Sequence, residues 1–193
     1  MGRDQTRERI LDTAERLFFG DGIAVTGVDR VAGEAGVAIA TLYQHVGSKD
    51  GLLAAVLERR LAAWTAQWEA TIEAAGSPRG RLLALFDALA DFRRSSGTTQ
   101  WCCFLATASE RPSGRAGDPV QALVEADTTA LTSRLAGLAR EAGLADPDAV
   151  ADRLVVVYDG ALAGLLRGAP ADPIGVARAI ADQLVPVEEP PAA

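Results

Sequence analysis

The sequence predicts an all-α protein, and three observations lead to this fold class. Alanine and leucine abound while β-branched runs are few, apolar residues recur at helical spacing, and no alternation of period two persists. With 193 residues, of which 49% are hydrophobic, the chain can bury a substantial core. We expect nine helices and no strands.

Four helices are expected in the first 76 residues. The first has one apolar face, formed by Ile10, Leu11, Ala14, Leu17 and Phe18. The second starts at Thr26, whose hydroxyl can cap the backbone N–H of Asp29. It stops at Gly36, where a left-handed turn costs a glycine little. The third covers about residues 38–45, and Ser48 caps a long fourth helix.

A small polar residue followed by proline marks four further helix starts. Proline suits the first helical position because its missing N–H is not needed there. The four pairs are Ser77-Pro78, Asp118-Pro119, Asp146-Pro147 and Asp172-Pro173. A shorter apolar helix is expected around residues 101–108, followed by an irregular segment at 110–117. The acidic, proline-rich end at 187–193 is expected to be a disordered tail.

Charge and motif content exclude several classes of protein. A net charge of −7 argues against a generally basic nucleic-acid-binding surface. Adjacent Cys102 and Cys103 cannot build a disulfide framework. No apolar run reaches the roughly 18 residues that span a bilayer, and the start of the chain is charged, so we expect a cytoplasmic protein without a membrane partner. No metal-ligand spacing, phosphate loop or nucleophile–base pair indicates an enzyme, a metal or a cofactor.

The most informative pattern lies between residues 26 and 53. In a helix-turn-helix, two helices cross near a right angle, so one position must be small, one must turn and one must fill the angle. Ala32, Gly36 and Leu42 fit these roles in this order, at spacings of four and six. The pattern predicts a helix-turn-helix.

The same region resembles the TetR family of one-component repressors. The resemblance rests on Thr-Leu-Tyr-x-His followed by Ser-Lys-Asp-x-Leu-Leu over residues 41–53, with Thr26, Ala32, Ala35 and Gly36 upstream. It implies a homodimer whose subunits each have a three-helix DNA-binding head and a six-helix body that binds a small effector. The implied limits are residues 1–50 for the head and 51–186 for the body, which would dimerise through its last two long helices.

Nine residues are expected to contact an operator in double-stranded DNA: Thr26, Arg30, Ala38, Ile39, Thr41, Tyr43, Gln44, His45 and Lys49. By the resemblance, Tyr43 and Lys49 look like phosphate contacts, with Lys49 aided by a helix N-terminus. Gln44 is the best candidate for reading a base, because its amide can bond an adenine edge through two atoms. The apolar start of the recognition helix suits thymine methyl groups. His45 either contacts DNA or packs at the helix end.

A small-molecule pocket is expected among the fourth to eighth helices. Aromatic residues cluster here, although ordinary core packing can explain each of them. The candidate pocket residues are Trp64, Trp68, Phe86, Leu89, Phe92, Trp101, Cys102, Phe104, Leu123, Asp127, Tyr158 and Leu162. A carboxylate of Asp87, Asp91, Asp127 or Asp159 would favour a cationic or hydroxylated ligand.

Small residues on the eighth helix, at Gly160, Ala161 and Gly164, allow another helix to come close. That neighbour belongs either to a second subunit or to the same chain. The candidate dimer-interface residues are Leu154, Tyr158, Ala161, Leu165, Ala177, Ile180 and Leu184.

Together these patterns predict a ligand-responsive repressor, released from a near-palindromic operator when a small molecule binds the body. The alternative is a helical ligand- or partner-binding module of the same fold without specific DNA binding. The apolar start of the recognition helix and the lack of a basic patch favour this alternative.

Overall fold

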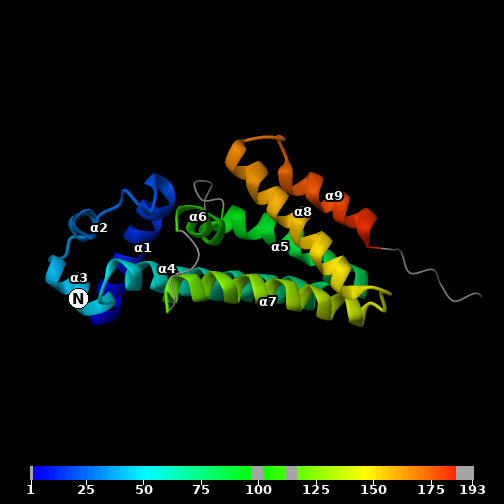
Figure 1. The fold of residues 1–193 in the computed structure, drawn as a ribbon, viewed down its shortest axis with the longest axis horizontal. Coiled ribbons are helices and arrows are strands. Elements are labelled where there is room, and N and C mark those ends of the chain that lie inside the picture. Colours follow the sequence, from blue (N-terminus) through cyan, green and yellow to red (C-terminus); the bar gives the residue numbers. More distant parts are fainter. Residues whose placement is uncertain (1, 97–101, 112–116, 186–193) are drawn as a thin grey trace, which may run out of the picture. The chain divides into compact units, whose positions relative to one another are not determined.

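A computed structural model describes residues 2–96, 102–111 and 117–185 (Figure 1). Within these ranges the chain forms nine helices and no strand, which confirms the predicted fold class. The helices are α1 (Arg3–Asp21), α2 (Val28–Glu34), α3 (Ile39–Val46), α4 (Lys49–Ala74), α5 (Pro78–Ser96), α6 (Cys103–Glu110), α7 (Pro119–Glu141), α8 (Pro147–Arg167) and α9 (Pro173–Leu184). Over the described part of the chain, no helix is both long enough and apolar enough to cross a membrane.

The helices form two compact units. Unit 1 consists of Met1–Ala62 and Cys102–Asp127, and unit 2 of Ala63–Trp101 and Thr128–Ala193. Unit 1 therefore contains the first half of α4, all of α6 and the first part of α7 in addition to the three helices of the predicted head. The limits proposed from the family pattern, at residues 50 and 51, stay a prediction. The predicted tail at 187–193 lies outside the described residues.

The core of unit 1 forms where the apolar faces of its helices meet. Helices α1, α2 and α3 pack on one another. The first helix buries the face that the sequence predicted. The side chains with at most 1% exposure include Ile10, Leu11, Leu17, Phe18, Val31, Ala32, Leu42, Leu52, Leu53, Val56 and Leu57. At about 1.5–3 kcal/mol for each large apolar side chain taken out of water, these contacts dominate the stability of the unit.

The start of α2 differs from its prediction. Gly27 occupies the cap position, and no side chain caps the helix. The Thr26 hydroxyl donates instead to the carbonyl oxygen of Gly22, at 2.7 Å, and to that of Leu17, at 3.3 Å. These carbonyls lie at the end of α1 and just after it. Thr26 therefore ties the turn back onto α1, and its side chain is fully buried.

The other predicted caps are confirmed. Each cap oxygen accepts a backbone N–H in the first turn of its helix, which satisfies a donor that the helix leaves unpaired. The pairs are Ser48 with Gly51 (2.9 Å), Ser77 with Gly80 (3.0 Å), Asp118 with Val120 (2.9 Å), Asp146 with Ala149 (3.2 Å) and Asp172 with Gly175 (2.8 Å).

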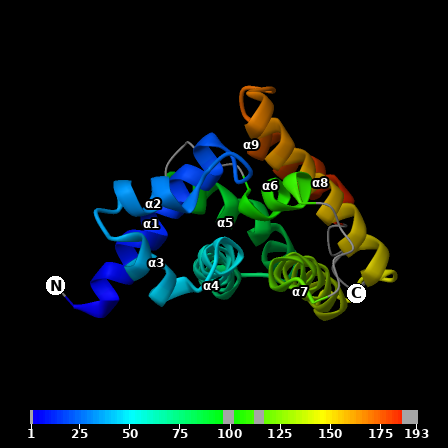
Figure 2. The ribbon, with the colours of Figure 1, turned by 60° about the vertical axis from the view of Figure 1, so that its left-hand side comes forward.

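In unit 2, α8 and α9 lie side by side, and α9 also packs on α5 (Figure 2). The close approach of α8 and α9 depends on Gly164. A Cβ atom at this position would lie 2.6 Å from the Cβ atom of Pro173, which is too short for a real contact. The sequence left open whether the small residues of α8 face a second subunit or the same chain. At Gly164 they face the same chain. At Gly160 a Cβ atom would meet no described atom within 4 Å.

Candidate functional site

The helix-turn-helix is built by the three residues that the spacing singled out. Ala32 is 1% exposed and Leu42 is fully buried, so the first allows the close approach and the second fills the angle between α2 and α3. Gly36 has a φ of +64°, a conformation that glycine adopts without a steric cost. The N–H of Val37 then bonds the carbonyl oxygen of Ala32 at 3.0 Å and closes the turn.

Helix α3 presents most of its surface to solvent. Leu42 is its one buried residue, whereas Ile39 is 46% and Tyr43 is 42% exposed. Ala38, just before the helix, and Gln44 are exposed as well, and Thr41 and His45 are half-buried. The side chains predicted to read bases are thus accessible on one short helix held by a single anchor.

Two of the predicted DNA contacts, Lys49 and Thr26, differ in how accessible their side chains are. Lys49 is half-buried at the start of α4, and its Nζ donates to the carbonyl oxygen of Ala24 at 3.3 Å. Thr26 does not fit the expectation, because its side chain is fully buried and its hydroxyl is bonded to two carbonyl oxygens. Its place in the DNA-contacting set is therefore corrected, and we assign it to the turn between α1 and α2.

Arg30 is exposed, but its charge is balanced. Its guanidinium lies 2.7 Å from Asp21 and 2.9 Å from Glu34, and Glu34 also pairs with Arg16. Hydrogen bonds from these two arginines lower the pKa of Glu34, and Glu34 raises the pKa of Arg30 in return. A phosphate that approached Arg30 would have to replace these carboxylates. The structure thus offers a reason why the head lacks a strongly basic surface.

Sequence patterns missed a second group of charged residues in unit 1. Arg59 on α4 bonds three carboxylates of α1, those of Glu8, Asp12 and Glu15, at 2.6–3.0 Å. Elsewhere in the unit, Glu110 and Arg111 bond to residues far away in the sequence. Glu8, Asp12 and Glu15 recur at helical spacing on α1, but the sequence does not indicate that Arg59 is their partner, or that Ile23 and Asp50 are partners of Glu110 and Arg111.

Four of the predicted pocket residues meet in unit 2. The ring of Trp64 stacks on Trp68 at 6.0 Å, meets Phe92 edge-on at 5.5 Å and lies 6.0 Å from Tyr158. The rings come from α4, α5 and α8. We call these four residues the aromatic cluster. The Trp68 side chain is buried, and its indole N–H has no hydrogen-bond partner among the described residues. A buried donor of this kind costs free energy unless an acceptor reaches it.

Asp159 follows Tyr158 on α8 and differs from the other candidate carboxylates. Asp87 pairs with Arg178 at 3.3 Å, and Asp91 pairs with Arg94. Asp159 is half-buried, and in the described part of the chain it has neither an ion pair nor a hydrogen bond to its side chain. Burial alone raises the pKa of its carboxyl above the ordinary value.

Phe86 and Phe104, the other aromatic pocket candidates in the described part of the chain, form no ring contact with the aromatic cluster. Leu89 and Leu162 are buried in unit 2. A further set, Cys102, Phe104, Leu123 and Asp127, belongs to unit 1. Trp101 lies outside the described residues. The predicted pocket thus divides between the two units, and the cluster in unit 2 is the part of it whose side chains are seen in contact.

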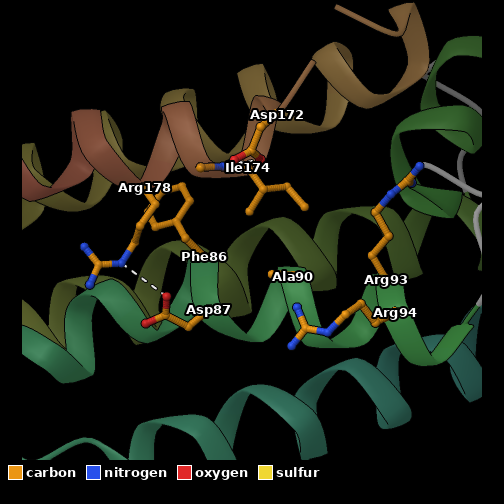
Figure 3. A pocket seen from close by; sticks show the side chains of 9 residues that line it. Phe86, Asp87, Ala90, Arg93, Arg94, Asp172, Ile174 and Arg178 are labelled. Atoms are coloured by element: carbon orange, nitrogen blue, oxygen red, sulfur yellow. Dashed lines mark hydrogen bonds and ion pairs between the residues drawn. The ribbon is translucent and has the colours of Figure 1, made fainter. Parts of the chain in front are cut away.

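Phe86, also a predicted pocket residue, lines a different cavity in unit 2. This cavity of about 450 Å³ lies between α5 and the start of α9 (Figure 3). Phe86, Ala90 and Ile174 form its apolar part. Of its charged residues, Arg178 pairs with Asp87 and Arg94 with Asp91, and the Asp172 carboxylate accepts the N–H of Gly175 at the start of α9. No carboxylate without a partner faces this cavity among its described lining residues.

The predicted dimer interface needs correction. Leu154, Tyr158, Ala161 and Ala177 are at most 9% exposed, so these side chains pack inside the subunit and cannot form its outer surface. Leu165 and Leu184 are half-buried, and Ile180 is 44% exposed. Four large apolar side chains of α8 and α9 are exposed, and we call them the outer strip: Val156, Leu166, Val176 and Ile180. Helical spacing could not separate the two faces, because both carry apolar residues.

A helix-turn-helix with an exposed second helix, joined to a helical body, defines a DNA-binding transcriptional regulator. Residues 10–56 match the family model described as bacterial regulatory proteins, tetR family. A TetR-family transcriptional regulator from Streptomyces coelicolor is 30% identical, with a TM-score of 0.86 over 94% of this chain and 95% of that one. The chain belongs to the TetR family.

Other relatives are similar over different lengths. The regulator BetI of Paraburkholderia phymatum is 29% identical over 175 residues, 88% of this chain and 86% of its own. The activator FasR of Mycolicibacterium smegmatis is 34% identical over 90 residues, 47% of this chain and 41% of its own. A Saccharomonospora viridis regulator, solved in complex with choline, has the same fold at 22% identity and a TM-score of 0.79, covering 94% of this chain and 96% of that one. These relatives are regulators of transcription rather than enzymes.

Proposed function

We propose that this protein is a repressor that binds a near-palindromic operator as a homodimer and leaves it when a small molecule binds the body. The exposed face of α3 is the observation that carries this proposal. Ile39, Tyr43 and Gln44 lie outside while Leu42 holds the helix. An amide beside apolar and aromatic side chains suits the edges and methyl groups of the major groove.

A second function is favoured by a specific observation. The charge of Arg30 is balanced by Asp21 and Glu34, and the start of α3 is apolar. These features suit a ligand- or partner-binding module that does not bind DNA specifically.

Binding to the DNA upstream of its own gene, measured across a salt series, separates the two functions. A repressor keeps its preference for that DNA over a scrambled duplex as salt rises, because base contacts are less sensitive to salt than phosphate contacts. Gln44→Ala should weaken this preference, and Asp148→Asn, an exposed change in unit 2, should keep it. Binding that shows no preference and is lost by moderate salt would favour the module.

The homodimer proposal is supported by the outer strip of α8 and α9. Val156 is 72% exposed and Leu166 is 56% exposed, and Gly160 leaves room for a neighbouring backbone. Large apolar side chains exposed together on two packed helices are typical of subunit interfaces. Analytical ultracentrifugation at micromolar concentration should give a dimer. A monomer under these conditions would overturn the dimer and tight operator binding with it.

The aromatic cluster and Asp159 support a cationic effector. A cation over an aromatic face gains about 0.5–2 kcal/mol, and an unpaired half-buried carboxylate favours a positive partner. The unpartnered indole N–H of Trp68 would in addition suit an oxygen acceptor on the same ligand. The S. viridis regulator holds choline, which combines a quaternary ammonium with a hydroxyl. We propose a small ligand of this class, an ammonium ion that carries a hydroxyl or carboxylate oxygen.

Choline and its neutral isostere 3,3-dimethylbutan-1-ol test the charge requirement. A ligand that binds the folded state raises the melting temperature. Choline should raise it and release the operator, and the isostere should do neither. Trp64→Leu and Asp159→Asn should abolish the response, whereas Asp152→Asn, which changes an exposed carboxylate on the same helix, should keep it. An equal rise in melting temperature with both compounds would rule out a cation site.

A further inference from the structure

The end of α6 contacts three other elements of unit 1. Glu110 is the last residue of α6, and Arg111 follows it as the C-cap. The Glu110 carboxylate accepts the backbone N–H groups of Ile23, at 3.3 Å, and Ala24, at 2.8 Å. The Arg111 guanidinium donates to Asp50 on α4 and to Asp118 before α7, at 2.6 Å in both cases.

Glu110 holds the segment that leads into the helix-turn-helix. Ile23 and Ala24 lie between α1 and α2, where the chain has no helical partner for its N–H groups. Bonds from backbone N–H groups to a carboxylate are stronger than bonds between neutral groups. The carbonyl oxygen of Ala24 meanwhile accepts Lys49 Nζ. The N–H of Ala24 is therefore bound by Glu110 of α6, and its carbonyl oxygen by Lys49, which looks like a phosphate contact.

Arg111 joins the starts of two long helices. Its side chain is 19% exposed, and that of Asp118 is 7% exposed, so little water screens this ion pair. Asp118 also accepts the N–H of Val120 as the cap of α7. Removing the charge of one partner leaves the other partly buried and unpaired, which costs more than breaking a surface pair. The bridge thus fixes the start of α4, directly after the recognition helix.

We propose that Glu110 and Arg111 are positioning residues for operator binding. They hold the segment before α2 and the start of α4 in the places from which α3 and Lys49 meet the DNA. Neither residue contacts DNA in this proposal. It rests on the proposed function, since it concerns the affinity of the repressor for its operator.

The direction in which the affinity for DNA changes distinguishes a positioning role from an effect of net charge. Glu110→Gln and Asp118→Asn each remove a negative charge from the DNA-binding unit, which by charge alone strengthens binding to DNA. Positioning predicts the opposite, a loss of about tenfold in operator affinity. Asparagine still caps α7, so Asp118→Asn removes the ion pair and keeps the helix start. Asp29→Asn, an exposed carboxylate on α2, is the matched control and should bind as well as the wild type or better.

The experiment uses the full chain and an operator duplex selected from a random DNA library. Fluorescence anisotropy should show the tenfold loss with an unchanged salt slope, because no phosphate contact is removed. Hydrogen exchange at the amides of Ile23 and Ala24 should become faster in Glu110→Gln, while the melting temperature stays near that of the wild type.

Three results bear on this proposal separately from the proposed function. If the wild type selects no operator, the proposed function fails. If the wild type binds and both variants bind equally well or more tightly, the positioning role is overturned and the repressor stands. A loss of affinity that only follows a lower fraction of folded protein, seen by stoichiometric titration, also overturns the positioning role.

Discussion

Helices α3 and α8 both expose apolar side chains, but they do so over different interiors. The eight residues of α3 have one buried member, Leu42, so nearly the whole helix is surface. The 21 residues of α8 bury a full face that includes Leu154 and Tyr158, and expose Val156 and Leu166 on another. Helix α3 is therefore an exposed surface that one buried side chain holds in place. Helix α8 instead has one face buried in the core and another face exposed to solvent.

This difference decides how each helix tolerates change. On α3 the anchor and the surface residues are separate, so surface residues can vary without loss of the fold. On α8, positions one or two residues apart face either the core or the outer strip, so the effect of a substitution depends on the position chosen. Substitutions in pairs on the two helices therefore test the comparison directly.

The largest effects are expected at the buried anchors. Leu42→Ala and Leu154→Ala each remove a fully buried side chain and should lower the free energy of unfolding by about 2–5 kcal/mol. Ile39→Ala, on the exposed side of α3, should cost less than about 1 kcal/mol. Urea denaturation followed by circular dichroism measures all three. A cost for Ile39→Ala equal to that of Leu42→Ala would contradict the single-anchor picture of α3.

The next effect is expected on the outer strip of α8. Val156→Glu places a charge in the proposed dimer interface and should raise the dimer dissociation constant about a hundredfold. The helix content of the subunit should not change, because Val156 is 72% exposed. Sedimentation velocity across a dilution series gives the dissociation constant. Arg153→Glu, also exposed on α8, indicates whether a charge change alone has this effect.

A smaller effect is expected on the reading surface of α3. Gln44→Ala should reduce the preference for one operator base pair by about tenfold, and Lys49→Ala should weaken binding to all duplexes and lower the salt slope by about one. Competition binding with single-base operator variants measures the first, and a salt series the second. If Lys49→Ala changes base preference instead, the assignment of these two roles is wrong.

The smallest effects concern pH and have opposite signs at two carboxyls. The Arg111 guanidinium holds the pKa of Asp118 below its ordinary value of about 3.9. Its contribution to stability is therefore present above that value and is lost as the pH falls through the lower, folded-state pKa. Burial raises the pKa of Asp159, so its charge destabilises the fold at neutral pH, and this penalty disappears in acid.

Thermal unfolding of two variants between pH 7 and pH 3 checks these signs. Asp159→Asn should raise the melting temperature at pH 7 and lose this advantage as the pH falls. Asp118→Asn should lower the melting temperature at pH 7 and approach the wild type in acid. The reverse order for either variant would contradict the assigned pKa direction.

Local patterns predicted the helix-turn-helix and four helix starts. Ala32, Gly36 and Leu42, the Ser77-Pro78 pair and the three Asp-Pro pairs all act on backbone only a few residues away. Thr26 was misassigned, since the extended backbone of Gly27 moves the helix start by two residues. The inner and outer faces of α8 were exchanged because both are apolar. Glu110 could not be predicted, because its partners Ile23 and Ala24 lie 87 and 86 residues away.

The buried thiol of Cys103 can report how often α6 opens. Burial raises the pKa of Cys103, and only the thiolate reacts readily with disulfide reagents. Cys103 therefore reacts when α6 opens locally, and the rate of that reaction reports how often it opens. Because α6 ends in Glu110 and Arg111, the labelling rate in the presence and absence of operator DNA would show whether the contact of α6 with the segment before α2 opens less often on DNA.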